Sequence, residues 1–162
     1  MLFPALRVGY LVIPPDLLAR FRRVRDAMDI FPSPLYQAVL GELIRDGHFA
    51  RHLRRMRAVY AERRRLLVSA LERELGDRAR IAGDRAGMHL VLRLPRGADD
   101  RDLAAQAARA GISVIPLSSC YLASRGQKPG LVLGYGATRA AEIADAARRL
   151  TSILVDHRRR GV

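Results

Sequence analysis

Two histidines four residues apart are the first feature of the sequence that could do chemistry. His48 and His52 would fall on one face of a helix, which is the spacing of two zinc ligands in zinc proteases. That motif needs a glutamate directly after the first histidine as general base, and Phe49 stands there instead. We therefore interpret the pair as solvent-facing residues at the start of a helix, and we predict no metal site.

A glycine-containing stretch and a serine–cysteine cluster are weaker candidates. The stretch GLVLGYGA lacks the spacing and the following helix start of a dinucleotide-binding loop, so we interpret it as a strand with close packing. Ser118, Ser119 and Cys120 could supply a nucleophile, but the sequence positions no base beside them and nothing activates the thiol. We predict no catalytic residue in either stretch.

Lys128 is the only lysine in the chain, and covalent aldehyde cofactors need a lysine. It lies in the stretch RGQKPG, where no apolar pocket is indicated, so we interpret it as an ordinary exposed lysine. The arginine-dense stretch RHLRRMRAVYAERRR surrounds an apolar stripe, and a solvated helix face is the default interpretation of such arginines.

Length and composition limit the classes of protein to which the chain can belong. Its 162 residues and 49% apolar content fit one domain or a piece of one, and they exclude a disordered chain. The apolar runs are too short for a membrane span and the start lacks a secretory signal, so we expect a cytoplasmic protein without a membrane partner. The single cysteine excludes an intramolecular disulfide. The net charge of +13 leaves open a stand-alone module that binds nucleic acid.

The apolar pattern predicts the elements that must position any site. Their order is strand, three helices, two strands, helix, two strands and helix, which predicts an α/β fold with helices layered on a small sheet. The expected elements are a strand over 8–13, helices over about 16–28, 34–45 and 48–75, a hairpin of 78–83 and 87–95, a helix within 98–111, strands within 112–117 and 131–136, and a last helix capped by Thr138.

We expect two parts, with a boundary near residue 47. Residues 48–162 would form a small domain led by the long helix, whereas residues 1–47 would be the remnant of a larger domain. The strand over 8–13 has no obvious sheet partner nearby, and the helices between Pro15 and Arg45 present apolar faces for partners outside the chain. We therefore expect the isolated chain to associate or to be poorly soluble.

Several segments together resemble the C-terminal part of the MocR-type GntR regulators, whose effector domain is similar to a class I aminotransferase. The segments are LFPALRVGYLVIPPDL, LYQAVLGELIRDGHFARHLRRMRAVYAERRRLLVSAL, GMHLVLRLP, AGISVIPLSSCYL and GLVLGYGA, and they follow the family's order over nearly all of the chain. The resemblance implies the C-terminal small domain of a pyridoxal 5'-phosphate (PLP)-dependent transferase fold of type I, plus the terminal strand and helices of the large domain. It also implies a homodimeric parent with an amine or amino acid effector, which binds DNA only through a region absent here.

The resemblance gives Arg7 a role. The stretch LFPALR is similar to the residues that follow the family's Schiff-base lysine, so Met1 takes the place directly after that lysine and Arg7 matches the arginine that binds the cofactor phosphate. A guanidinium offers a phosphate forked, permanently charged hydrogen bonds. We expect Arg7 to bind the phosphate of PLP in the intact parent. Without the lysine, we expect this chain neither to retain the cofactor nor to be catalytically active.

One position departs from the family's pattern. In aminotransferases the strand similar to GLVLGYGA often carries an arginine that binds the substrate carboxylate, and Val132 stands at that place here. The loss of a bidentate group weakens the case for an ordinary amino acid substrate and favours a regulator. A fragment of a genuine class I aminotransferase stays open as the alternative.

Overall fold

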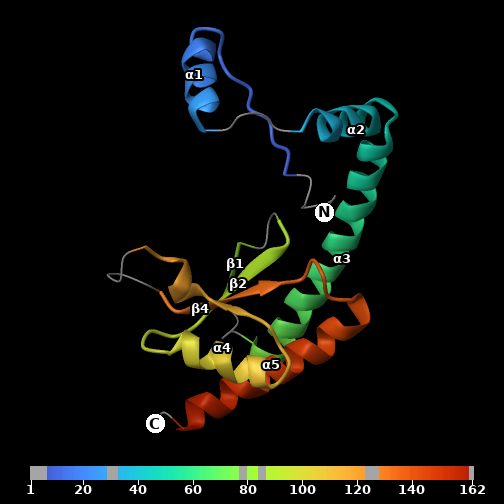
Figure 1. The fold of residues 1–162 in the computed structure, drawn as a ribbon. Coiled ribbons are helices and arrows are strands. Elements are labelled where there is room, and N and C mark those ends of the chain that lie inside the picture. The colour runs from blue at the N-terminus through green and yellow to red at the C-terminus, as the bar shows by residue number, and fades with distance from the viewer. Residues whose placement is uncertain (1–6, 29–32, 77–79, 84–86, 123–127, 161–162) are drawn as a thin grey trace. The chain divides into compact units, whose positions relative to one another are not determined.

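The computed structural model describes residues 7–28, 33–76, 80–83, 87–122 and 128–160, and for residues 158–160 it describes the backbone alone. The contacts divide the chain into two compact units, Met1–Arg57 and Ala58–Val162. The first contains α1 (Leu18–Met28), α2 (Pro34–Arg45) and the first part of α3 (His48–Leu75); the second contains the rest of α3 and every strand in the described ranges (Figure 1).

Two of the first three helices, α2 and α3, have the bounds that the sequence predicts, and α1 begins at Leu18, slightly later than predicted. Pro34 occupies the first turn of α2, where a missing backbone N–H costs nothing, and Ser33 stands at the N-cap position without a side-chain capping bond. Gly47 adopts a φ of 73° between α2 and α3, a left-handed conformation that glycine tolerates and that ends one helix before the next begins. The predicted helices over 34–45 and 48–75 are therefore confirmed.

The first unit lacks a core among its described residues, because none of them is buried. Tyr10 and Val12 are 89% and 90% exposed, and Met28 is 81% exposed. The other exposed large hydrophobic residues of this unit are Leu11, Leu18, Phe21, Val24, Leu35, Tyr36, Val39, Ile44 and Leu53. So many exposed large apolar side chains in one unit are typical of a surface that packs against another polypeptide.

The predicted strand over 8–13 is wrong. Residues 7–14 have no regular secondary structure, and the sheet's four strands all come from later in the chain. The β-branched and aromatic residues of this stretch favour an extended backbone, but a strand forms only when a neighbouring strand accepts its hydrogen bonds. Residues 1–6 lie outside the described ranges.

The second unit is built on an antiparallel sheet in the order β1-β2-β4-β3. β1 (Arg80–Ala82) and β2 (His89–Arg93) form the predicted hairpin, whose turn includes residues 84–86 outside the described ranges. β4 (Gly130–Gly134) lies between β2 and β3 (Ile115–Pro116), and a 3-10 helix, η3 (Leu117–Cys120), follows β3. The predicted strands of this part are thus confirmed, although β3 is only two residues long.

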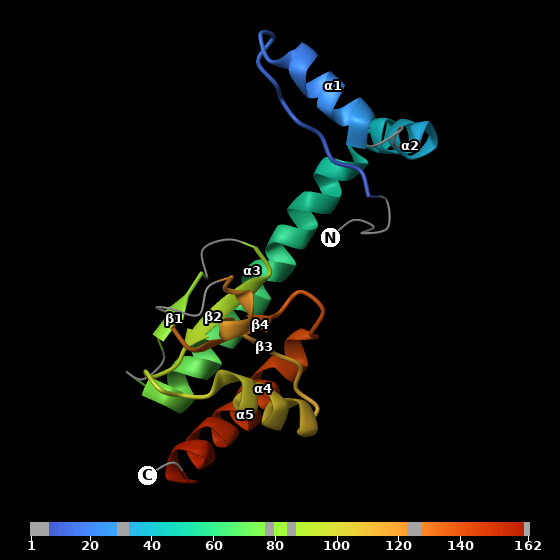
Figure 2. The same cartoon turned by 60° about the vertical axis from the view of Figure 1, so that its left-hand side comes forward.

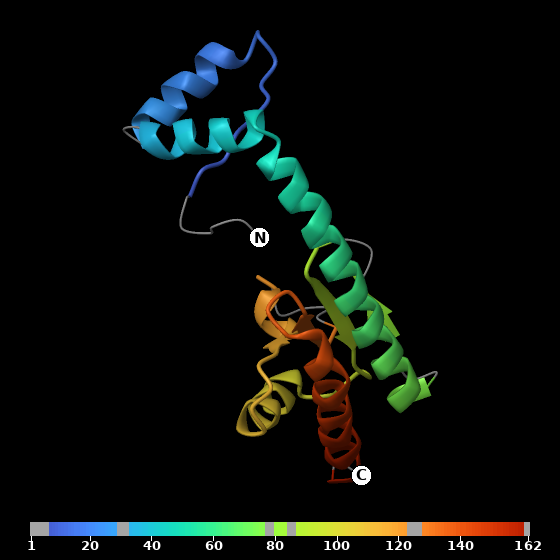
Figure 3. The ribbon, with the colours of Figure 1, turned by 90° about the vertical axis from the view of Figure 1, so that its right-hand side faces the viewer.

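Helices cover one face of this sheet. The C-terminal part of α3, together with α4 (Asp100–Arg109) and α5 (Ala140–Arg160), packs on that face (Figures 2 and 3). Side chains alternate along β2 and β4, so that every second leucine points into the helices. The core consists of Leu67, Ala70, Leu71, Leu90, Leu92, Leu103, Ala104, Ala107, Leu131, Leu133, Tyr135, Ile143, Ala147, Leu150 and Leu154.

Two polar side chains connect the ends of these elements. The phenol of Tyr135 donates a 3.0 Å hydrogen bond to the carbonyl of Gly87 in the hairpin connection, so this buried hydroxyl is satisfied. The guanidinium of Arg63 on α3 donates a 2.6 Å hydrogen bond to the carbonyl of Gly136, which follows β4. The contacts fix the hairpin and the β4–α5 connection on the rest of the unit.

The two later helices differ in how their first turns are capped. The carboxylate of Asp99 accepts 3.0 Å hydrogen bonds from the backbone N–H groups of Arg101 and Asp102, which makes Asp99 the N-cap of α4. The prediction that Thr138 caps the last helix is wrong, because α5 begins at Ala140. The Glu142 carboxylate instead accepts a 3.4 Å hydrogen bond from the backbone N–H of Arg139, the residue directly before α5.

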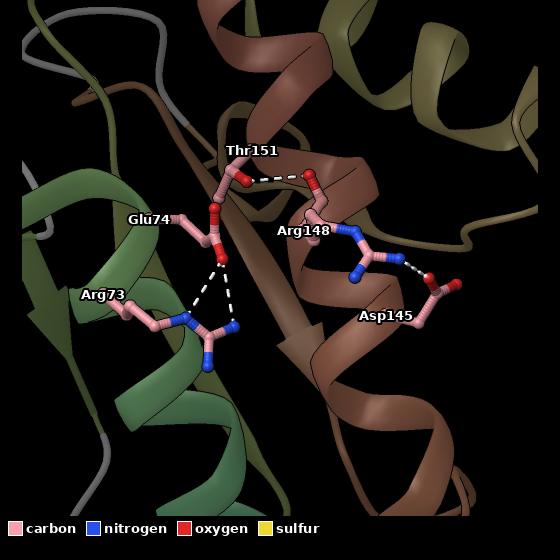
Figure 4. A network of polar contacts seen from close by, with 5 residues as sticks. All are labelled: Arg73, Glu74, Asp145, Arg148 and Thr151. Atoms are coloured by element: carbon pink, nitrogen blue, oxygen red, sulfur yellow. Dashed lines mark hydrogen bonds and ion pairs between the residues drawn. The ribbon is translucent and has the colours of Figure 1, made fainter.

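Ion pairs lie on the exposed faces of α3 and α5. Arg73 pairs with Glu74 at 3.0 Å in the last turn of α3, and Arg148 pairs with Asp145 on α5 (Figure 4). Beside the second pair the hydroxyl of the buried Thr151 donates to the Arg148 carbonyl at 2.8 Å. Exposed pairs of this kind contribute about 0–1 kcal/mol each, so the apolar core rather than these charges stabilises the unit.

None of the helices in the described part of the chain combines the length and the apolar character that a membrane span requires.

The location of the core predicts how two matched substitutions differ. Leu71→Ala removes a side chain that is 0% exposed and should lower the free energy of unfolding by about 2–5 kcal/mol. Leu35→Ala on α2 removes a side chain that is 67% exposed and should change the free energy of unfolding by less than about 0.5 kcal/mol. Urea denaturation of both variants checks this, and equal losses would contradict a core confined to the second unit.

Candidate functional site

An apolar row crosses the sheet face that the helices leave uncovered. The strand register places Ala82 opposite Val91, Val91 opposite Val132, and Val132 opposite Ile115. Val91 and Val132 alternate with core leucines, and Ile81 and Val114, which precede Ala82 and Ile115, also pack against the core, so the four side chains share the second face. Ile115 is 50% exposed.

Val132 is the middle of this row, and it is the position at which the family resemblance expects an arginine. The side chains of Val91 and Ile115 flank it on the neighbouring strands and offer no hydrogen-bond donors. The row therefore has no group of its own that binds a carboxylate. An apolar molecule or an apolar protein surface fits it better.

Arg7 is the first described residue and belongs to the first unit. It is exposed, and among the described residues its guanidinium makes no hydrogen bond or ion pair. Its φ of 47° is the only positive value of a non-glycine residue in the described ranges. Such a left-handed backbone costs an L-residue roughly 1–2 kcal/mol and is found mainly where surrounding structure or function demands it. The predicted phosphate-binding role stays a prediction.

Asp100 is a polar centre of the second unit that sequence reasoning missed. It is 3% exposed, and its carboxylate accepts hydrogen bonds from the backbone N–H groups of Ser118 at 2.9 Å and Gly130 at 3.0 Å. It also accepts a 2.6 Å bond from the hydroxyl of Ser118. The carboxylate thus joins the start of α4, the 3-10 helix and the first residue of β4. These partners lie 18 and 30 residues away, so no local spacing signals them.

The electrostatics of Asp100 follow from these contacts. Burial alone would raise the pKa of Asp100, but its three hydrogen bonds and the nearby guanidinium of Arg101 together hold that pKa below the usual value. The carboxylate is therefore ionised at neutral pH. It is a structural anion whose acceptor oxygens are already used by neighbouring donors.

The histidine pair, the serine–cysteine cluster and Lys128, which the sequence analysis considered as candidates, do not form a catalytic site in the described ranges. His48 is exposed as predicted, and its ring lies 3.1 Å from the guanidinium of Arg51. The prediction of a solvent-facing residue is wrong for His52, whose Nε2 is shielded from solvent. No three potential metal ligands gather anywhere in the described ranges. The hydroxyl of Ser119 donates to the carbonyl of Pro116 at 2.7 Å. Cys120 and Lys128 are both exposed.

The glycines of the GLVLGYGA stretch serve close packing, as predicted. A Cβ at Gly130 would lie 3.0 Å from the carbonyl oxygen of Leu92, and one at Gly136 would lie 3.1 Å from the sulfur of Met88. Both distances are shorter than side chains normally allow, so the neighbouring segments approach these residues because no side chain is present.

A cavity of about 530 Å³ opens between α5 and residues 111–114 and 133–135. Its carboxylates are engaged, because Glu142 pairs with Arg139 and Asp145 pairs with Arg148. No lysine lines it, so it does not provide the amine that a covalent aldehyde cofactor needs.

With this geometry in view, comparisons with known proteins decide the family. The model of the family "Aminotransferase class I and II" matches residues 1–151. The chain belongs to this family. The match runs through both units and includes Arg7, Asp100 and Val132.

Relatives of this aminotransferase-family chain include regulators and enzymes. The probable rhizopine catabolism regulatory protein MocR of Rhizobium meliloti is 43% identical over 134 residues, which are 83% of this chain and 27% of that protein. The 2-aminoadipate transaminase of Thermus thermophilus is 29% identical over 150 residues, 93% of this chain and 37% of the enzyme. The chain thus spans about a third of the length of these relatives.

The fold of this aminotransferase-family chain is similar to that of a solved aminotransferase structure. The crystal structure of LysN, an α-aminoadipate aminotransferase from Thermus thermophilus, matches with a TM-score of 0.84 and 28% identity over 95% of this chain and 39% of that one. The predicted fold class, α/β with the architecture of a PLP-dependent transferase, is therefore confirmed.

The contacts of Asp100 predict a large, pH-dependent effect of its removal. Asp100→Ala leaves two backbone N–H groups without an acceptor and should lower the free energy of unfolding by about 2–5 kcal/mol, whereas Asp156→Ala on the exposed side of α5 should have little effect. Chemical denaturation at pH 7 measures both.

The sign of the pH dependence follows from the lowered pKa. The ionised Asp100 stabilises the fold above its unfolded pKa of about 3.9, and this stabilisation is lost as the pH falls through the lower folded value. The stability difference between the wild type and Asp100→Asn should therefore shrink below about pH 4. A difference that stays constant from pH 7 to pH 3 would show that the charge of Asp100 contributes nothing.

Proposed function

We propose that this chain is the C-terminal, effector-sensing part of a PLP-dependent, aminotransferase-like transcriptional regulator of the MocR type. The observation that carries the proposal is the 43% identity to MocR over 83% of the chain, compared with 29% identity to a transaminase. Residues 1–47 would belong to the end of a large cofactor domain, and residues 48–162 to the small domain. The exposed apolar surface of the first unit supports this division, since it needs a partner to cover it.

The cofactor of the intact parent would be PLP. The related LysN structure is described as complexed with N-(5'-phosphopyridoxyl)-L-leucine, a compound that joins the cofactor skeleton to an amino acid. When bound, PLP supplies an aldehyde that condenses with amines. Arg7 fits the phosphate end of such a group, because its forked guanidinium is exposed and has no partner among the described residues.

The apolar row through Val132 supports sensing rather than turnover of an ordinary amino acid. Val132 and its neighbours provide no donor for a substrate carboxylate, so an α-carboxylate would lose the bidentate contact that an arginine provides. An effector that places an apolar part against this row fits it better. In the parent we propose a cytoplasmic homodimer that reaches DNA through a region outside this chain.

A fragment of a genuine aminotransferase is the second candidate. It is favoured by the 2-aminoadipate transaminase of Thermus thermophilus, which matches 93% of this chain. The gene sequence before the codon of Met1 separates the two candidates. A winged helix-turn-helix signature in the same frame supports the regulator, whereas a cofactor domain without one supports the enzyme.

The role of Arg7 predicts a selective loss of cofactor affinity. In the full-length product of the gene, Arg7→Gln should weaken the binding of PLP about 10- to 100-fold, because charge-assisted hydrogen bonds to a phosphate are lost. The affinity for pyridoxal, which lacks the phosphate, should not change. Fluorescence titration with both compounds measures this, and Arg20→Gln on α1 is the matched control.

Either of two results would sink the assignment of Arg7. One is equal weakening of PLP and pyridoxal binding by Arg7→Gln. The other is an unchanged affinity for PLP.

The isolated chain should not catalyse transamination. Its only lysine, Lys128, is exposed and no pocket residue of the described ranges provides another amine. Incubation of the chain with PLP, an amino acid and an oxo acid should therefore yield product at the rate of PLP alone. Turnover above that rate that disappears in Lys128→Ala would show that Lys128 is catalytic and that this proposal is wrong.

A further inference from the structure

Two arginines lie directly opposite each other on the uncovered face of the sheet. The register of β1 and β2 pairs Arg80 with Arg93. The adjacent pair, Ile81 and Leu92, points into the helix-covered core, so Arg80 and Arg93 must point the other way. Like charges directly across a strand pair are destabilising, and such a pair therefore calls for a compensating group.

No compensating group is found among the described residues. Neither Arg80 nor Arg93 forms an ion pair with any carboxylate in the described ranges. One terminal nitrogen of Arg93, Nη1, is shielded from solvent and has no hydrogen-bond partner there. A shielded, unsatisfied donor on a charged group costs more than one left in water, and native structures contain few of them.

The other strand neighbour of Arg93 offers no acceptor to its side chain. Gly130 is its register partner on β4, and the side chain of Leu117 occupies the space over this glycine, 3.1 Å from where a Cβ would be. The backbone N–H of Gly130 is already bound to Asp100. Arg93 thus lies between an apolar flank and a second guanidinium, with no protein acceptor on either strand neighbour.

We propose that Arg80 and Arg93 form a binding site for a small oxyanion, a carboxylate or a phosphate group. The two guanidiniums present their donors from neighbouring strands, and a planar or tetrahedral oxyanion accepts such forked hydrogen bonds. The bound anion accepts hydrogen bonds from the guanidinium donors that solvent can reach and cancels the repulsion between the two arginines. This site is separate from the predicted contact of Arg7 and does not depend on the proposed regulatory function.

The test measures anion binding by the full chain. Inorganic phosphate and acetate are titrated separately at constant ionic strength, with sodium chloride as balance, and binding is followed by calorimetry and by the unfolding midpoint. Phosphate or acetate should bind and raise the midpoint, because a ligand that binds only the folded state stabilises it. The anion that binds more tightly distinguishes a phosphate site from a carboxylate site.

Matched variants separate this site from general charge attraction. Arg93→Gln should weaken binding of the preferred anion at least about tenfold, and Arg80→Gln should also weaken it. Arg96→Gln, in the exposed turn after β2, removes the same charge and should leave the affinity unchanged. Without added anion, Arg93→Gln should be no less stable than the wild type, because it removes an unsatisfied donor.

Three results would overturn the proposal. The first is that neither anion binds the wild-type chain. The second is that Arg96→Gln weakens binding as much as Arg93→Gln does. The third is that Arg93→Gln lowers stability equally with and without anion, which would make Arg93 a structural residue; Arg80→Gln provides the same comparison if Arg93→Gln does not fold.

Discussion

The burial of leucines between one face of a small sheet and three helices is the constraint on which the second unit depends. Leu90, Leu92, Leu131 and Leu133 alternate along the two central strands, so a single face of the sheet supplies the core. This alternation also determines what the other face carries, because the residues between the leucines must point away from the helices. The apolar row through Val132 and the pair Arg80–Arg93 are both consequences of that pattern.

In the first unit, by contrast, the apolar side chains are not buried between two packed surfaces. Its described helices are amphipathic and regular, yet none of their residues is buried. Local sequence is sufficient to form α1 and α2, whereas a core requires a second apolar surface. The family model matches this unit, and the chain spans about a third of the length of its relatives. Both observations agree with the proposal that another part of the parent protein packs against the first unit.

Elements with local signals could be predicted from the sequence, and contacts between distant residues could not. Pro34 and Gly47 mark helix ends through their own backbone preferences, and the structure confirms the helices that they delimit. The strand over 8–13 fails because its formation depends on a partner that local composition does not reveal. The Asp100 contacts were missed for the same reason, since Ser118 and Gly130 meet only through the fold. For the site, the resemblance supplied Arg7 and Val132, whereas the pairing of Arg80 with Arg93 required the register.

Hydrogen exchange of backbone amides tests the central claim, that the first unit is ordered only against polypeptide outside this chain. In the isolated chain, amides of α1 and α2 should exchange close to the rate of an unprotected peptide, while those of β2, β4 and α5 should be strongly protected. In the full-length gene product, α1 and α2 should become protected as well. Protection of α1 and α2 in a monomeric isolated chain, equal to that of α5, would contradict the account.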